Sequence, residues 1–93
     1  MSIQSFRDRV TGEVLQTGTS REHGNIATVA FRKLNMLDAA VELFDLRRAP
    51  GNRLEALKGN CQGQHSIRIN DQFRICFVWT SAGPTEVEIT DYH

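Results

Sequence analysis

The sequence predicts an α+β domain in which two helices pack on a small, twisted, mainly antiparallel sheet. Apolar residues recur at helical spacing between residues 25 and 44, and at the two-residue spacing of strands after residue 65. The change of period follows Ala49-Pro50-Gly51-Asn52, a segment typical of a turn. The chain has no internal repeat and no linker, so residues 1–93 are expected to form a single domain.

The first predicted elements are a short strand over residues 3–6 and a short helix over residues 9–16. Val10 and Val14 lie four positions apart in this helix and would share one face. Gly18 can adopt the left-handed conformation that ends many helices. A polar loop is expected to follow before the main helical segment.

The main helical segment is expected to begin at Asn25, whose side-chain oxygen can accept a hydrogen bond from a first-turn amide. The apolar stripe of this helix, which we interpret as core, comprises Ile26, Val29, Ala30, Leu34 and Leu37, and the residues off the stripe are Arg32, Lys33 and Asn35. The stripe extends further along the chain. The helix therefore either continues through Phe44 or breaks near Asp38 and restarts.

Alternating apolar and polar residues predict three strands in the C-terminal half, over residues 66–70, 73–79 and 85–92, with turns near residues 70–72 and 81–84. The side chains of Asn70 and Asp71 suit the first turn. A three-residue loop would place Arg68 and Arg74 on one face, whereas a two-residue loop would place them on opposite faces. We favour the three-residue loop because it also keeps the Ile and Phe positions together.

Charge is unevenly distributed, although the net charge is formally zero. Residues 47–74 hold six Lys/Arg and two Asp/Glu, residues 1–46 hold five and six, and residues 75–93 hold three acids without Lys or Arg. Affinity for nucleic acid comes mainly from summed phosphate neutralisation, so this chain is poorly suited to grip a long polyanion alone. A local basic face fits a short contact with a few phosphates.

Several protein classes are disfavoured. No apolar run approaches the ~20 residues that span a bilayer and the N-terminus lacks a signal-peptide core, so we expect a cytoplasmic protein with no membrane partner. Cys61 and Cys76 form no disulfide framework and are interpreted as small buried hydrophobes. The sequence has neither zinc-ligand spacing nor a GxGxxG motif or P-loop, which predicts that no metal and no cofactor is used.

The candidate site lies in residues 52–93, where a carboxylate, several cations and a C-terminal histidine fall on the predicted sheet. Cleaving RNA without a metal requires a base near the ribose 2′-OH, cations around the phosphate and an acid for the departing 5′-oxygen. His93 suits the acid, because histidine titrates near neutrality and the adjacent α-carboxylate favours the imidazolium.

The segments LEALKG, SIRINDQFRICF and the terminal DYH, in this order and in a chain of this size, resemble the HigB branch of the RelE/ParE toxin superfamily. Residues 52–93 carry the resemblance, and residues 1–51 match in element order and length. It implies a RelE-like fold and a ribosome-dependent endoribonuclease toxin that cleaves A-site mRNA by 2′-OH attack. It also implies three partners: a HigA-like helix-turn-helix antitoxin, the 70S ribosome with its mRNA, and operator DNA contacted only through the antitoxin.

The resemblance also assigns roles to the basic and acidic residues. Glu55 matches the general-base glutamate of YoeB-type relatives, and either Glu55 or Lys58 could take the proton. Arg68 matches the catalytic arginine of those relatives, and Lys58 and Arg74 match basic residues of the family site. The chain departs from some HigB members at Asn70, where they carry an arginine.

The remaining candidates are terminal or RNA-facing. Tyr92 and His93 match the terminal Tyr-His of the family, and Asp91 could support the imidazole or an arginine. His65 stands where relatives often place an aromatic residue, so it could stack on a base or pack in the fold. Together with Arg53 and Asn70, His65 and Asp91 are the candidate RNA-binding residues.

Plainer interpretations remain open at this stage. Glu55 could be a solvated carboxylate paired with Arg53 or Lys58, strand arginines often form a solvated face, and His93 could be a frayed terminus. The second functional hypothesis is a catalytically weak binding module that acts with its antitoxin in a DNA-binding repressor complex. The third is a plain protein–protein interaction domain. The neutral net charge and Asn70 favour the binding module.

Overall fold

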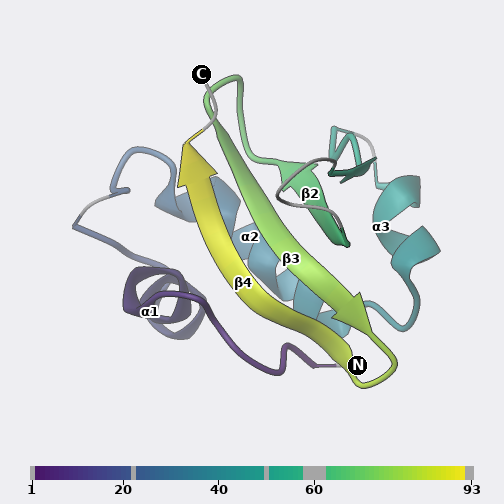
Figure 1. The fold of residues 1–93 in the computed structure, drawn as a ribbon. Coiled ribbons are helices and arrows are strands. Elements are labelled where there is room, and N and C mark those ends of the chain that lie inside the picture. Colours follow the sequence, from purple (N-terminus) through teal and green to yellow (C-terminus); the bar gives the residue numbers. More distant parts are fainter. Residues whose placement is uncertain (1, 22, 50, 58–62, 92–93) are drawn as a thin grey trace.

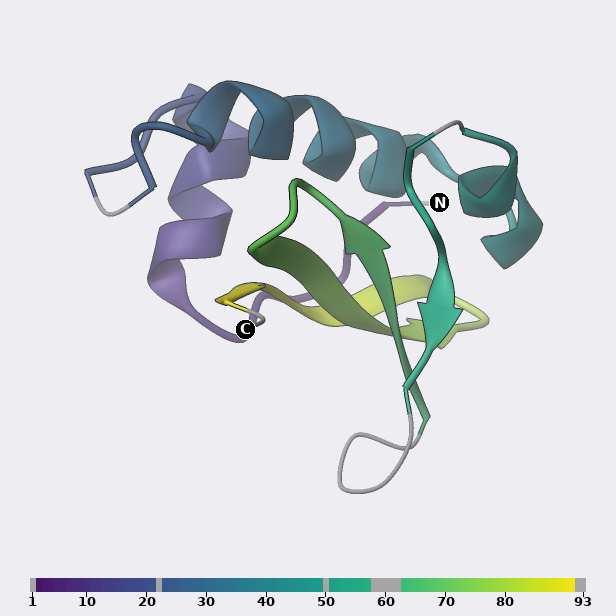
Figure 2. The ribbon, with the colours of Figure 1, turned by 90° about the horizontal axis from the view of Figure 1, so that it is seen from above.

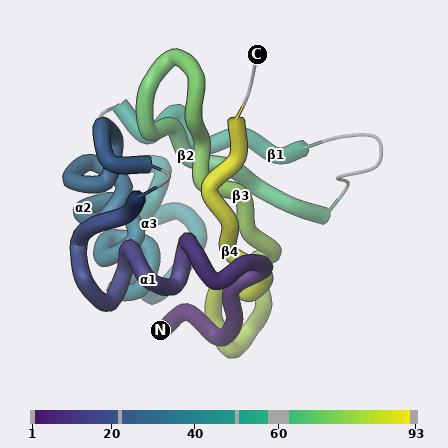
Figure 3. Tube along the Cα trace, turned by 90° about the vertical axis from the view of Figure 1, so that its left-hand side faces the viewer, coloured from purple at the N-terminus to yellow at the C-terminus, as the bar shows by residue number. Residues whose placement is uncertain are grey.

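The computed structural model describes residues 2–21, 23–49, 51–57 and 63–91. Within these residues the helices are α1 (Arg9–Thr17), α2 (Ala27–Ala39) and α3 (Leu43–Arg48), and the strands are β1 (Glu55–Ala56), β2 (Gln64–Arg68), β3 (Phe73–Thr80) and β4 (Gly83–Asp91). The four strands form one antiparallel sheet in the order β1-β2-β3-β4 (Figure 1). All the helices of the described residues lie on one side of this sheet (Figure 2, Figure 3). The predicted α+β class is confirmed.

The helix-facing side of the sheet is apolar. Ile67, Ile75 and Ile89 lie side by side across β2, β3 and β4, because Ile67 pairs with Ile75 and Ile75 with Ile89. They pack in one buried core with Leu34 and Leu37 of α2. Side chains alternate along a strand, so the residues next to each of these isoleucines in sequence point to the opposite side of the sheet. No helix of the described residues covers that side. We call that side the open face.

The β2–β3 hairpin has the three-residue loop that the sequence predicts. Arg68 and Arg74 are direct partners across the two strands. The N–H of Ile69 donates to the carbonyl of Phe73 at 2.9 Å, which closes the loop. The side-chain oxygen of Asn70 accepts two amide hydrogen bonds within the turn, at 2.8 and 2.7 Å. This register places both arginines on the open face.

The predicted N-terminal strand is replaced by looser contacts along β4. Residues 3–6 make one parallel bridge, from Phe6 to Val87, and the N–H of Gln4 donates to the carbonyl of Pro84 at 2.8 Å. The segment must turn almost at once into α1, which leaves too few residues to form a strand. It still shields the outer edge of β4, so β1 is the edge strand that no other described segment pairs with on its outer side (Figure 2).

The first helix forms as predicted. The Asp8 carboxylate caps α1 by accepting a hydrogen bond from the amide of Thr11 at 3.0 Å. Gly18 ends the helix with φ of 75°, and its N–H donates to the carbonyl of Val14 at 2.8 Å. A residue with a side chain rarely adopts this backbone conformation, so the glycine is required here.

The second helical segment differs from the prediction in two details. Asn25 is not the N-cap, because a turn that places the Ile26 amide 3.0 Å from the His23 carbonyl moves the start of α2 to Ala27. The apolar stripe is broken after Ala39 and restarts as α3, which is the second of the two predicted alternatives. A reciprocal capping box, in which Glu42 and Asp45 each bond the other's backbone N–H, begins α3.

Two buried polar side chains connect the helices to the sheet. Lys33 and Asn52 are 6% and 0% exposed, and the Lys33 ammonium donates to the Asn52 side-chain oxygen at 2.8 Å. The side-chain amide of Asn52 donates to the Leu46 carbonyl at 3.0 Å, and the backbone carbonyl of Asn52 accepts from the Arg68 backbone amide at 2.6 Å. The expectation that Lys33 lies off the packed stripe is therefore wrong. The segment around Asn52 covers that side of α2 and buries the lysine.

We expect Asn52→Leu to lower the free energy of unfolding by about 3 kcal/mol, because the Lys33 ammonium would stay buried without its acceptor. Leucine has nearly the same volume, so the effect would report the lost hydrogen bonds. The measurement is urea unfolding followed by circular dichroism. Asn35→Leu is the control, because Asn35 is exposed on the same helix. An Asn52→Leu protein as stable as the control variant contradicts the prediction.

Candidate active site

Four polar side chains share the open face because of the strand register. Glu55 of β1 pairs with Ser66 of β2, and Arg68 of β2 pairs with Arg74 of β3. Directly paired residues point to the same side of a sheet, and so do residues two positions apart in one strand. Glu55, Ser66, Arg68 and Arg74 therefore lie on one face, as the sequence analysis requires of a joint site.

Three of these side chains, those of Glu55, Arg68 and Arg74, border a hollow of about 290 Å³, which we call the open-face hollow. Its walls are formed by Arg53, Glu55, Arg68, Asn70, Asp71 and Arg74. All of them except Asp71 are among the site residues predicted from the sequence. Three guanidinium groups and two carboxylates around one solvent-open hollow suit a small anion such as a phosphate group.

Arg74 is held in place before any ligand binds. Its Nε donates to the Ser66 hydroxyl at 2.8 Å, and its Nη2 donates to the Arg53 carbonyl at 2.6 Å. Nη2 also lies 3.4 Å from the Ser66 carbonyl. The guanidinium thus has a fixed orientation, which lowers the entropic cost of binding an anion. Ser66 begins the strand predicted over residues 66–70 and was not among the predicted site residues. Its place two positions before Arg68 was the available signal for the shared face.

The backbone of Arg53 is in the left-handed region, with φ of 45°. Such a conformation costs a non-glycine residue about 1 kcal/mol or more and persists only where neighbouring contacts impose it. Here the contacts are two hydrogen bonds to the sheet, from the Arg68 amide to the Asn52 carbonyl and from Arg74 to the Arg53 carbonyl. The kink therefore ties the segment before β1 to both arginines.

Arg68 is paired within its own hairpin. Its guanidinium forms an ion pair with Asp71, whose side chain is 99% exposed. An exposed pair of this kind contributes only about 0–1 kcal/mol, so a phosphate can displace Asp71. Arg68 and Arg74 are also direct cross-strand partners, and like charges in such positions repel. An anion placed between them would relieve the repulsion.

The buried Lys33 is electrostatically linked to this face. Its pKa is lowered first by burial, and then by the positive charges of Arg32, Arg68 and Arg74. A neutral amine can still donate a hydrogen bond to Asn52, so deprotonation would leave that contact intact.

Two predicted site residues lie away from the hollow. His65 pairs with Phe77 on the helix-facing side and stacks on its ring, with the centroids 6.2 Å apart and 22° between the planes. Asp91 pairs with Phe73, which is on that same side, because the neighbouring pair Thr90 and Arg74 faces the other way. Four residues assigned from the sequence lie outside the described residues: Lys58, Cys61, Tyr92 and His93. Cys76 is buried, as expected.

Comparison with known proteins identifies the class. The family model described as the RelE-like toxin of the type II toxin–antitoxin system HigB matches residues 4–93. Toxin HigB-1 of Vibrio cholerae serotype O1 is 53% identical over 55 residues, which cover 59% of this chain and 58% of that protein. An uncharacterized protein of Haemophilus influenzae is 36% identical over 76 residues, covering 80% of this chain and 75% of that protein.

The fold and these matches define a RelE-like toxin of a type II toxin–antitoxin system. Within that class, the chain belongs to the HigB family. The aligned segment spans little more than half of Toxin HigB-1, at 58% of its length. Among the described helices, none has the length and apolar character to cross a membrane.

The pH dependence of stability tests the Lys33 environment. Because the folded-state pKa of Lys33 is lowered from 10.5, the unfolded chain binds this proton more tightly than the folded chain. The contribution of Lys33 to the free energy of unfolding should therefore rise as pH increases from below the folded pKa toward 10.5. We expect the free energy of unfolding of the native protein minus that of Lys33→Met to increase across that range in urea titrations.

Arg21→Met is the control for this experiment, because it removes a cation from an exposed loop. Its stability difference from the native protein should stay constant over the same pH range. A difference for Lys33→Met that also stays constant would show that burial does not perturb the amine.

Proposed function

We propose that this protein is a metal-independent endoribonuclease toxin that cleaves A-site mRNA on the ribosome and is neutralised by a HigA-like helix-turn-helix antitoxin. The main support is the placement of Arg68 and Arg74 as direct partners beside Glu55 in one hollow. Opposed cations with a nearby carboxylate provide anion binding and proton acceptance together. Membership in the HigB toxin family agrees with this activity.

The proposed reaction is an internal transfer on the RNA. Glu55, or Lys58 in its place, accepts the proton of the ribose 2′-OH, and the 2′-oxygen forms a bond to the adjacent phosphorus. The bond from phosphorus to the 5′-oxygen breaks, and His93 donates a proton to that oxygen. The products are a 2′,3′-cyclic phosphate and a 5′-OH. The atoms and protons balance without a metal or redox partner.

Arg74 would stabilise the negative charge that develops on the phosphate in the transition state. Its bonds to Ser66 and Arg53 use Nε and Nη2, and no described residue accepts a hydrogen bond from Nη1. A donor fixed before the reaction need not reorganise during it, and such donors are each worth about 10²–10³-fold in rate. Arg68 would act once the substrate phosphate has replaced Asp71.

A role for the ribosome is proposed from membership in the HigB family. The neutral net charge of the chain supports this role. The hollow presents three arginines, but the whole chain has a formal net charge of zero. Binding long RNA depends on neutralising many phosphates, so this surface alone would hold free mRNA weakly. A particle that presents the message would supply the missing affinity.

A catalytically weak binding module, acting with the antitoxin in a DNA-binding repressor complex, is the second candidate. The observation in its favour is the ion pair between Arg68 and Asp71, which occupies one of the two opposed arginines. Expression of the toxin without its antitoxin separates the candidates. Growth arrest that Arg74→Ala abolishes supports the nuclease, and harmless expression of folded protein supports the binding module.

We expect Glu55→Gln and Arg74→Ala each to lower mRNA cleavage about 100-fold or more, because one loses the proton acceptor and the other a preorganised cation. Cleavage is measured by primer extension on a message under translation. Glu13→Gln is the matched control, since Glu13 is an exposed carboxylate on α1. Circular dichroism checks folding. Full cleavage by both site variants would exclude the open-face hollow as the active site.

The role of His93 as the proton donor is tested by removing its imidazole. His93→Gln should lower mRNA cleavage about tenfold or more, because a glutamine side chain cannot supply a proton to the departing 5′-oxygen. His23→Gln is the matched control, since His23 is not among the residues that form the open-face hollow. Equal cleavage by His93→Gln and the native protein would remove His93 from the mechanism.

A further inference from the structure

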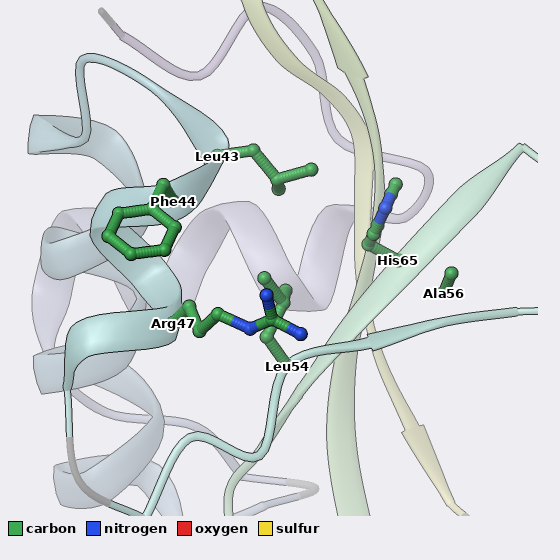
Figure 4. A pocket seen from close by; sticks show the side chains of 6 residues that line it. All are labelled: Leu43, Phe44, Arg47, Leu54, Ala56 and His65. Atoms are coloured by element: carbon green, nitrogen blue, oxygen red, sulfur yellow. The ribbon is translucent and has the colours of Figure 1, made fainter.

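A second hollow lies on the helix-facing side of the sheet edge. We call it the α3 pocket; it has a volume of about 320 Å³ and mainly apolar walls. It is lined by Leu43, Phe44 and Arg47 of α3, by Leu54 and Ala56 at β1, and by His65 of β2 (Figure 4). Glu55 and Ala56 are adjacent in β1 and point to opposite sides, so this pocket and the open-face hollow are separate.

The α3 pocket and the start of α3 expose large apolar side chains that a bound partner would cover. Phe44, which lines the pocket, is 49% exposed, and Val41, just before α3, is 65% exposed. Exposed large apolar side chains that gather at one pocket are typical of a surface that is covered in a complex.

The charge at the pocket is positive and locally unpaired. The Arg47 side chain extends from α3 toward Leu54 (Figure 4). Within the described part of the chain, no carboxylate forms an ion pair with Arg47. The nearby Asp45 carboxylate accepts hydrogen bonds from the amides of Val41 and Glu42 instead. An apolar pocket with the Arg47 guanidinium at its wall is complementary to an apolar side chain beside an acidic one.

We infer that the α3 pocket binds a segment of the cognate antitoxin, which inserts one apolar side chain beside Phe44 and His65 and pairs a carboxylate with Arg47. RNA is a poorer occupant, because the walls contributed by Leu43 and Leu54 are aliphatic and a nucleotide chain needs several cations. The antitoxin follows from membership in the HigB family, so the inference does not rest on the proposed nuclease activity.

Two variants block the pocket in different ways. Ala56→Trp fills it from an exposed position on the edge strand, where an aromatic residue suits the backbone. Arg47→Glu reverses the charge of an exposed helix residue and leaves the core untouched. Circular dichroism and thermal unfolding establish that each variant is folded.

Isothermal titration calorimetry of the purified toxin with the purified cognate antitoxin measures the effect. We expect Ala56→Trp and Arg47→Glu each to raise the Kd about tenfold or more, as for central interface residues. Arg47→Lys should keep the Kd within about threefold, because it retains the charge. Arg21→Glu is the matched control, since it reverses an exposed charge on the α1–α2 loop, far from α3 (Figure 1).

The inference is overturned if the folded Ala56→Trp and Arg47→Glu proteins bind the antitoxin with the same Kd as the native protein. It is also overturned if these variants lose mRNA cleavage while binding antitoxin normally, because the pocket would then serve RNA. Weaker antitoxin binding supports the inference whether or not the native toxin cleaves RNA. The outcome is therefore independent of the nuclease proposal.

Discussion

The buried amide of Asn52 fixes the point where the chain passes from the helices to the sheet. Its side chain accepts a hydrogen bond from Lys33 of α2 and donates one to the Leu46 carbonyl of α3, and the backbone carbonyl of Asn52 accepts one from the Arg68 amide of β2. Three elements that are distant in sequence are thus joined through one side chain and its own backbone. Because the next residue, Arg53, then bonds Arg74, the same constraint that joins the layers also orients the arginine in the open-face hollow.

The hydrogen bonds around Asn52 hold two unfavourable local arrangements in place at the open-face hollow. The left-handed backbone of Arg53 costs about 1 kcal/mol or more, and the repulsion between the like charges of Arg68 and Arg74 costs up to about 1 kcal/mol. The hydrogen bonds of Asn52 to Lys33, Leu46 and Arg68 hold the chain in this arrangement. An unstrained segment before β1 would be more stable, but it would leave Arg74 without its carbonyl acceptor.

The sequence predicted features that depend on local periodicity and missed those that depend on packing. The two-residue alternation and the turn chemistry of Asn70 were enough to place Arg68 and Arg74 together. Burial of Lys33 could not be predicted from helical spacing, because it depends on a segment 19 residues away folding over α2. His65 was ambiguous for a related reason. Only the strand pairing shows that it faces the helices and stacks on Phe77.

The two-residue strand β1 connects the open-face hollow with the α3 pocket. Glu55 lines the first and Ala56 the second, and both follow the Asn52–Arg53 kink. The position of this strand depends on the residue that precedes the kink, because Asn52 is bonded to Lys33 of α2, to Leu46 of α3 and to Arg68 of β2. The contact between Lys33 and Asn52, buried between the helices and the sheet, therefore supports both hollows as well as the fold.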